Sequence, residues 1–303
     1  MSSDVKIKSI LPELCLIGAA TFWASSFIAT KIAFRSYDPM VVVFSRMLIG
    51  SICFLLMSIR YKLAFSYRKG DYKLLFFMAF CEPCLYFLFE AHAIVNTTAS
   101  QAGMISAILP VFVMIVAGFL LNERTGIKGW SGALIALAGV IWLTLESSPQ
   151  ENAPNPMLGN FLEILAMICA AGYMIAIRIL TARYSPLFLT AVQAFAGCFF
   201  FFPFLLLPKT ELPTEMVFSS AAAVFYLGTV VTIGAFGLYN YGLKHVPVSR
   251  ASSYVNLIPV FSVMLGWIIL GETLSGNQLL AAAVVMLGVW LTQQRGAKKQ
   301  IRV

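Results

Sequence analysis

The sequence has very little charge and almost no histidine. Only 11% of its 303 residues are charged and two are histidine, whereas 60% are hydrophobic. A typical soluble domain is about 25% charged and about 45–50% apolar, so this composition excludes a soluble globular protein. The formal net charge of +8 does not indicate nucleic-acid binding, because the positive residues lie in short segments between long apolar runs. The chain is therefore predicted to be an integral membrane protein.

Motifs of several enzyme and nucleotide-binding classes are also missing. The sequence has no G-x-x-x-x-G-K-[ST] loop, no H-E-x-x-H motif and no aspartate inside an apolar run. ATP hydrolysis by this chain and metal-dependent chemistry are therefore disfavoured. One C-x-x-C pair occurs, Cys81 and Cys84, but it lies inside an apolar run with no second pair, where cysteine behaves as a small hydrophobic residue. We expect no metal site and no cofactor.

Ten apolar runs are each long enough to cross a membrane, which takes about 17–25 helical residues. Turn residues or charges separate them. The runs cover residues 11–33, 41–59, 74–94, 98–121, 129–145, 158–181, 187–207, 218–243, 248–270 and 276–292. The sequence therefore predicts an all-α membrane protein with ten transmembrane helices.

One sequence pattern occurs twice, in the fourth and fifth runs and again in the ninth and tenth. A shift of 149 residues aligns, without a gap, Pro110 with Pro259, Glu123 with Glu272 and Gly139 with Gly288. Such self-similarity indicates a duplication, and an odd number of helices per copy inverts the second copy. We expect two inverted five-helix repeats, residues 1–148 and 149–303, with the substrate site where they meet, as in many secondary transporters.

The positive charges test the helix count independently. If the N-terminus is cytoplasmic, only four of the 21 lysine and arginine residues fall near the outer face: Lys31, Arg35, Arg46 and Lys209. Cytoplasmic segments of membrane proteins carry an excess of lysine and arginine. We therefore expect both termini in the cytoplasm. The short loops fit a bacterial inner membrane.

The first two runs complete a resemblance to a known family. Trp23 is followed by Lys31 in the first run, Arg46 lies early in the second, and both copies carry a Pro-Val-Phe segment that ends in glutamate before a Gly-Val pair. In this order and spacing the chain resembles the EamA type of the drug/metabolite transporter superfamily over nearly its whole length. The resemblance implies transport of small organic solutes. The sixth run departs from the pattern, because it has Arg178 in place of Lys31 but no tryptophan in place of Trp23.

Polar side chains deep inside the apolar runs are the candidates for a substrate site. Glu82 lies near the middle of the third run, where an ionised carboxylate costs about 2.5–3.5 kcal/mol. We expect it to sense the substrate or a coupling proton, and Pro83 to kink its helix. Glu90 follows two turns later and is expected nearer the outer interface. Aromatic and amide groups that suit an amphiphilic substrate complete the set: Trp23, Tyr86, Tyr173, Tyr239, Asn240, Tyr254 and Asn256.

A second group of residues is expected to gate the pathway or to support the fold: Lys31, Arg46, Pro83, Pro110 and Pro259. Lys31 and Arg46 are expected to extend toward the lipid headgroups, as long cationic side chains near helix ends do. Glu163, near the start of the sixth run, is expected to reach the interface and to be structural. Glu123 and Glu272 are expected to cap turns between helices.

Two functions remain open. The first is a secondary transporter, an exporter of small organic metabolites such as amino acids or amphiphilic compounds, that works by alternating access with protons as the candidate coupling ion. The second is an intramembrane enzyme acting on a lipid-soluble substrate, which the missing aspartates and metal motifs weaken. Solute flux in proteoliposomes against product formation in detergent distinguishes them. No nucleic-acid partner is expected.

The expected topology can be tested by thiol labelling. Ser66→Cys lies in a segment expected in the cytoplasm, and Asn152→Cys lies in one expected outside. A membrane-impermeant thiol reagent added to intact cells is therefore expected to modify only the second variant, with lysed cells as the control. Equal labelling of both variants in sealed cells would overturn the topology.

Overall fold

The computed structural model describes residues 3–61, 68–121, 126–246, 251 and 254–293. Every regular element in these ranges is helical, and their β-type pairing is limited to an isolated bridge between Gln150 and Ala153. Eight helical segments of the described residues are long and apolar enough to span a membrane. Two shorter apolar segments, Leu257–Leu270 and Gly276–Thr292, bring the number to ten. The predicted all-α, ten-helix fold is confirmed.

The first five segments follow one another with short connections. The first segment is α1 (Ser3–Ala33) and the second is α2 (Pro39–Tyr61). The third combines α3 (Tyr72–Ala79), η1 (Phe80–Leu85) and α4 (Tyr86–Asn96). The fourth combines α5 (Ala99–Ile105), η2 (Ser106–Ile108) and α6 (Leu109–Leu121), and the fifth is α7 (Ile127–Leu145).

The second five segments begin after the loop that contains the isolated bridge. The sixth segment is α8 (Pro156–Thr181), and the seventh is α9 (Pro186–Phe201) extended by η3 (Phe202–Leu206). The eighth combines α10 (Phe218–Tyr226), η4 (Leu227–Ala235) and α11 (Phe236–His245). The ninth combines α13 (Leu257–Leu265) and η5 (Gly266–Leu270), and the tenth is α14 (Gly276–Gln293). Local signals set two of the starts: Asn155 and Ser185 accept from backbone N–H groups of the first turns of α8 and α9, and each is followed by proline.

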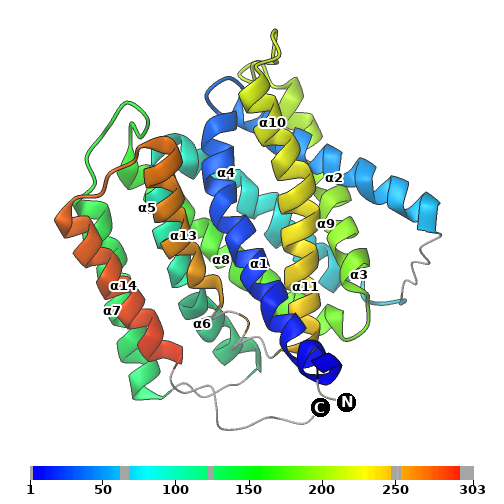
Figure 1. Ribbon diagram of the computed structural model, residues 1–303, viewed down its shortest axis with the longest axis horizontal. Coiled ribbons are helices and arrows are strands. Elements are labelled where there is room, and N and C mark those ends of the chain that lie inside the picture. The colour runs from blue at the N-terminus through cyan, green and yellow to red at the C-terminus, as the bar shows by residue number, and fades with distance from the viewer. Residues whose placement is uncertain (1–2, 62–67, 122–125, 247–250, 252–253, 294–303) are drawn as a thin grey trace.

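The two ends of the bundle are distinguished by the segments that meet there. α1 begins and α14 ends at one end, at the bottom of Figure 1, which we call the terminal end. The loop with the paired Gln150 and Ala153 lies at the other, which we call the hairpin end. Because each helix runs from one end of the bundle to the other, side chains in the middle of the helices lie at similar depths between the two ends.

The third and eighth segments are interrupted at corresponding positions. η1 and η4 are both π-type turns inside otherwise α-helical segments, and such turns bend a helix. Within η1 the backbone of Glu82 is extended, with φ −147° and ψ 115°, and Pro83 follows through a cis peptide bond. The kink predicted at Pro83 is present.

The two matching prolines lie in the first turns of α6 and α13, and the first of them is in the middle of the fourth segment. Pro110 is the second residue of α6, directly after the 3-10 turn η2, and Pro259 is the third residue of α13. A proline in a first turn is tolerated because its missing N–H would have no helical acceptor. Both prolines are buried, so they shape the backbone inside the bundle.

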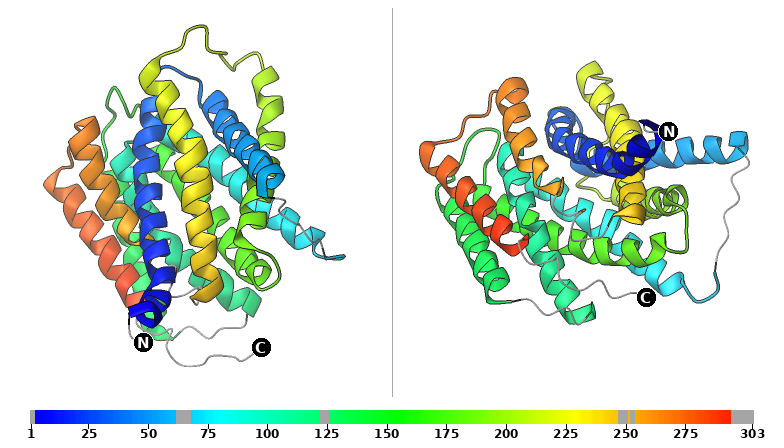
Figure 2. Two further views of the ribbon diagram at one scale, coloured as in Figure 1. Left: turned by 45° about the vertical axis from the view of Figure 1, so that its right-hand side comes forward. Right: turned by 60° about the horizontal axis from the view of Figure 1, so that its bottom comes forward.

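Helices α7 and α14 lie side by side at one edge of the bundle (Figures 1 and 2) and pack through glycines. A Cβ atom on Gly139 would lie 2.7 Å from the backbone nitrogen of Val285, and one on Gly288 would meet the backbone of Ala136. The shift of 149 residues converts the first contact into the second. The α7–α14 contact therefore has local two-fold symmetry, which supports the expected pair of inverted repeats.

This glycine contact predicts an unusual response to alanine. In a helix interior, Gly→Ala ordinarily stabilises by about 0.5–1 kcal/mol. Gly139→Ala is instead expected to destabilise the protein by about 1–3 kcal/mol, the usual result of overpacking. Gly237→Ala on α11 is the matched control, because its Cβ would meet nothing within 4 Å. Thermal unfolding of both variants in detergent checks this, and a melting temperature of Gly139→Ala at or above that of the control would contradict it.

Candidate functional site

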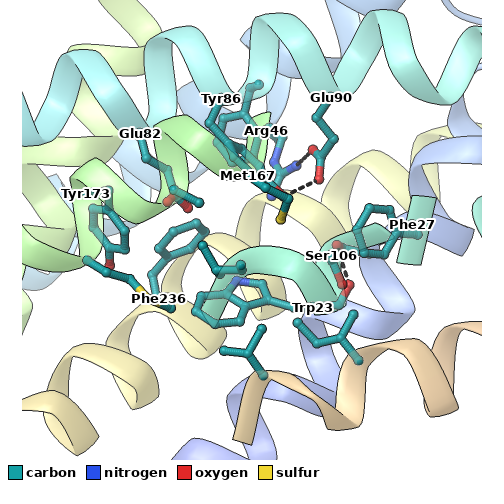
Figure 3. Close-up of a pocket in the computed structure, with 17 residues that line it drawn as sticks. Trp23, Phe27, Arg46, Glu82, Tyr86, Glu90, Ser106, Met167, Tyr173 and Phe236 are labelled. Carbon is teal, nitrogen blue, oxygen red and sulfur yellow. Dashed lines mark hydrogen bonds and ion pairs between the residues drawn. The ribbon is translucent and has the colours of Figure 1, made fainter. Parts of the chain in front are cut away.

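A cavity of about 40 Å³ lies between the two halves of the chain, and both halves line it. Its walls come from α1, α2, η1, α4, η2 and α6 on one side and from α8, α11 and α13 on the other. Most of the lining is apolar or aromatic. The residues that define its chemistry are Trp23, Phe27, Arg46, Glu82, Tyr86, Phe87, Glu90, Tyr173 and Phe236. Figure 3 shows Glu82 and Tyr173 on one side of this group, with Arg46, Tyr86 and Glu90 on the other.

Arg46 is the buried cation of the cavity. Its side chain belongs to α2, is 2% exposed, and places Nη1 4.0 Å from Oε2 of Glu90 on α4. The guanidinium carbon also lies 4.2 Å from the centroid of the Phe87 ring, a cation–π contact. Tyr86 donates a 2.7 Å hydrogen bond to Oε1 of Glu90. The arginine and the carboxylate therefore neutralise each other within one layer of the bundle.

One donor of Arg46 remains unused. Its Nε is buried and has no hydrogen-bond partner in the part of the chain that the structure describes. A buried donor without an acceptor is costly, and Arg46 lines the cavity. Arg46 therefore brings a buried positive charge with an unpartnered donor to the cavity wall.

Glu82 is the second carboxylate of the cavity. It is 5% exposed, as is Glu90. Its backbone carbonyl accepts a 3.3 Å hydrogen bond from Nε2 of Gln193 on α9, so the kinked backbone of η1 is held by the second half of the chain. The kink directs this side chain into the cavity, beside Tyr173 and Phe236 (Figure 3).

Two expectations about charged residues are wrong. Arg46 does not extend to the headgroups, and Glu90 is no closer to water than Glu82. Because α2 packs against α4, Arg46 and Glu90 form an ion pair inside the bundle and do not reach the interface. The signal in the sequence was the presence of one arginine and one glutamate well inside neighbouring apolar runs.

The aromatic and amide candidates divide between the cavity wall and a layer behind it. Trp23, Tyr86 and Tyr173 line the cavity. Tyr173 donates a 2.7 Å hydrogen bond to Oδ1 of Asn240, whose Nδ2 donates to Oγ1 of Thr190 at 2.8 Å. Asn240 therefore lies behind Tyr173 and fixes its hydroxyl.

Three further candidates also lie outside the cavity lining. Tyr239 is fully buried, and its ring centroid lies 4.7 Å from that of Trp23, which it supports from behind. Tyr254 and Asn256 flank Val255, which lines the cavity in their place. Sequence reasoning missed several lining residues, namely Ser26, Ser106, Met167, Met174 and Phe236. All but the two serines are apolar, and no pattern distinguishes them from core residues.

Lys31 binds backbone carbonyl groups at the hairpin end. Its Nζ donates to the carbonyl oxygens of Ile94 at 2.6 Å, Thr97 at 2.7 Å and Asn152 at 2.5 Å. The expectation that Lys31 reaches the headgroups is therefore wrong. It caps the last turn of α4, where a cation is favoured by the helix dipole.

Glu272 caps the helix that follows the same break. Its carboxylate accepts from the backbone N–H groups of Ala99 at 2.9 Å and Ser100 at 2.8 Å, at the start of α5. An anion is favoured at a helix N-terminus. The expected capping role of Glu272 is thus confirmed, and it joins the two halves of the chain. Glu123 lies outside the described residues.

A related contact occurs at the terminal end. Arg178 on α8 donates from Nη1 to the carbonyl oxygen of Leu243, in the last turn of α11, at 2.5 Å. Leu243 corresponds to Ile94 under the shift of 149 residues. Arg178 corresponds to Lys31 under a shift of 147, which also aligns Pro39 with Pro186. The two cations therefore make equivalent contacts at opposite ends of the bundle.

The residues that hold the cavity can be compared with those of metal sites. Among the described residues there is no group of three or more His, Cys, Asp and Glu side chains placed to hold a metal ion. The cavity is lined by one ion pair, one further carboxylate and aromatic rings.

Comparisons with known proteins agree with this architecture. The chain is 26% identical over 283 residues to the uncharacterized transporter YetK of Bacillus subtilis (strain 168), covering 91% of this chain and 85% of that one. It is 22% identical over 284 residues to the probable terminal-alkyne amino-acid exporter of Streptantibioticus cattleyicolor, covering 92% of each. A solved crystal structure matches with a TM-score of 0.67 at 19% identity, covering 93% of this chain and 96% of that one, which shows the shared fold.

A family model provides the assignment. The model described as the EamA-like transporter family matches residues 10–145 and, a second time, residues 157–293. Together the two matches cover most of the chain, and the named relatives are transporters. The protein is an integral membrane protein, and it belongs to the EamA-like transporter family.

Proposed function

We propose that this protein is a secondary transporter that exports small organic metabolites, amino acids or other amphiphilic compounds, across a bacterial inner membrane. The observation that carries the proposal is the central cavity, whose wall contains buried charges of both signs and is shared by the two halves of the chain. Transporters with inverted repeats bind their substrates near the middle of the membrane, where the repeats meet.

The charges of the cavity favour a zwitterionic substrate. The guanidinium of Arg46 offers a positive charge for a carboxylate, and Glu82 offers an acceptor for an ammonium group. Trp23, Tyr173 and Phe236 provide aromatic surface for an apolar side chain. The Streptantibioticus relative, whose printed name is that of an amino-acid exporter, supports the same substrate class.

The contacts at the two ends support alternating access. At the hairpin end Lys31 and Glu272 hold the break between α4 and α5, and at the terminal end Arg178 holds the end of α11. The contacts of Lys31 and Arg178 are equivalent under the repeat. The first half can therefore close the hairpin end in the same way as the second half closes the terminal end. Opening one end while the other stays closed would move the substrate across the membrane.

Glu82→Gln tests the role of the central carboxylate. Glutamine keeps the shape of the protonated acid but cannot ionise, so protons and a substrate ammonium group no longer compete for this position. Wild-type transport is expected to fall as pH is lowered, because protonation of Glu82 removes the charge that binds the substrate. Glu82→Gln is expected to be slow at every pH and to lose the part of this fall that Glu82 causes. Counterflow of a mixture of the twenty common amino acids into proteoliposomes over a pH series measures this.

Two variants complete this test. Glu151→Gln changes an exposed carboxylate and is expected to behave as wild type. Glu90→Gln is expected to lower the yield of folded protein, because removing one partner of a buried ion pair costs about 3–5 kcal/mol. Gel filtration separates folding from transport. A wild-type pH profile in Glu82→Gln would return that residue to a structural role.

Lys31→Met tests the contact at the hairpin end. The substitution keeps a long apolar stem but removes three hydrogen bonds from a charged donor, each worth about 1.5–3 kcal/mol. The cavity is then expected to open more often on that side. In a variant without the native cysteines, Ser106→Cys, which lines the cavity, is expected to react faster with an impermeant thiol reagent added to intact cells. Lys209→Met, at an exposed position, is the control, and equal rates in both would contradict the role.

A further inference from the structure

Glu163 on α8 is buried and has no hydrogen-bond partner. Its exposure is 0%, and neither carboxylate oxygen has a partner among the residues that the structure describes. The expectation that it reaches the interface is wrong, because this face of α8 is covered by other helices. One turn earlier, Asn160 accepts from Thr97 and donates to Thr144. The neighbouring polar position is thus satisfied, whereas Glu163 is not.

The helix that covers Glu163 can be identified from the glycines of α8. A Cβ atom on Gly159 would lie 2.8 Å from the backbone nitrogen of Thr97, and one on Gly172 would lie 3.1 Å from Sγ of Cys81. α8 therefore runs antiparallel to the third segment and in close contact with it. The level of Glu163, between these two contacts, is the level of Glu90.

The ionisable groups around Glu163 are few. Glu90 and Tyr86 lie on α4, which packs against α8 in the register given by the two glycine contacts. Arg46 of α2 is the counter-ion of Glu90, and Glu82 of η1 lies beyond them on the cavity wall. α5, η2 and α6 also pack against α8 and contain no ionisable residue. The ionisable groups of α3, α7, α9 and α11 lie at other levels of α8.

The charges of this cluster do not balance if both facing glutamates are ionised. Arg46 supplies one positive charge, and its ion pair with Glu90 together with the hydrogen bond from Tyr86 assigns that charge to Glu90. Two neighbouring carboxylates with one counter-ion hold a proton between them. The carboxylate without a donor is Glu163, so the proton belongs there.

We propose that Glu163 is the proton-binding site of the transport cycle, separate from the substrate cavity and coupled to it through Glu90. This proposal rests on the proposed transport function. One proton from water adds to a carboxylate oxygen of Glu163 and gives the neutral acid, and release returns the proton to water and leaves the carboxylate. A substrate ammonium group held at Glu82, on the same cavity wall, adds a positive charge near Glu90. That charge favours the ionised form of Glu163, which releases its proton, so one proton exchanges for one substrate molecule.

The proton on Glu163 can be measured without any substrate. Infrared difference spectra of the full chain in lipid nanodiscs, recorded over a pH series, report the C=O stretch of a protonated carboxyl group that makes no hydrogen bond. This band is expected in wild type, in Glu82→Gln and in Glu151→Gln, and it is expected to be lost in Glu163→Gln. A band that persists in folded Glu163→Gln would overturn the proposal.

Coupling is measured separately, as protons moved per amino acid exchanged. Proteoliposomes that contain a pH-sensitive dye report proton movement when the mixture of the twenty amino acids is added, and mass spectrometry reports the exchange. The ratio is expected to fall to background in Glu163→Gln and to be restored in Glu163→Asp, which a purely structural role would not do. An unchanged ratio in Glu163→Gln would refute coupling. Absence of any exchange in wild type would refute the proposed substrate class, and the infrared band would then decide the assignment of Glu163.

Discussion

The ion pair between Arg46 and Glu90 is the interaction on which the centre of the molecule depends. Both charges are buried, so each requires the other, and a guanidinium stays protonated under all ordinary conditions. The pair fixes α2 against α4, holds Phe87 beneath the guanidinium, and orients Tyr86 through its hydroxyl. The cavity wall is therefore built around a neutral unit. The negative charges of the other buried carboxylates near this pair, Glu82 and Glu163, must be offset by other groups.

Backbone groups impose a second constraint, because a lipid-embedded chain must satisfy its N–H and C=O groups internally. The break between α4 and α5 leaves carbonyl groups on one side and N–H groups on the other. Lys31 binds the first set and Glu272 the second, each from a different half of the chain. The break between α4 and α5 is thus satisfied by two distant side chains of the correct charge. This explains why Lys31, one of the few charged residues inside apolar runs, has no place in the cavity.

The sequence was sufficient to predict the ten helices, because length, hydropathy and the distribution of lysine and arginine act locally and independently of packing. It also predicted Trp23, Glu82, Tyr86, Glu90 and Tyr173, which the structure brings together around one cavity. It could not separate them from Tyr239, Asn240, Tyr254 and Asn256, because a polar group inside a membrane helix produces the same pattern whether it faces a cavity or a neighbouring helix. The pairing of Arg46 with Glu90 required knowledge of which helices touch, and that depends on contacts between distant segments.

The symmetric contact of α7 with α14 has a consequence for the energetics of the proposed cycle. Gly139 meets Ala281 and Val285, and under the repeat these contacts become those of Gly288 with Gly132 and Ala136. If the two halves exchange conformations, the α7–α14 contact is converted into itself, so its energy is the same before and after the exchange. This contact therefore favours neither of the two conformations. Any preference between the two conformations must then arise where the halves differ. Examples are Glu82, whose counterpart is Val231, and Trp23, whose place in the second half is not taken by a tryptophan.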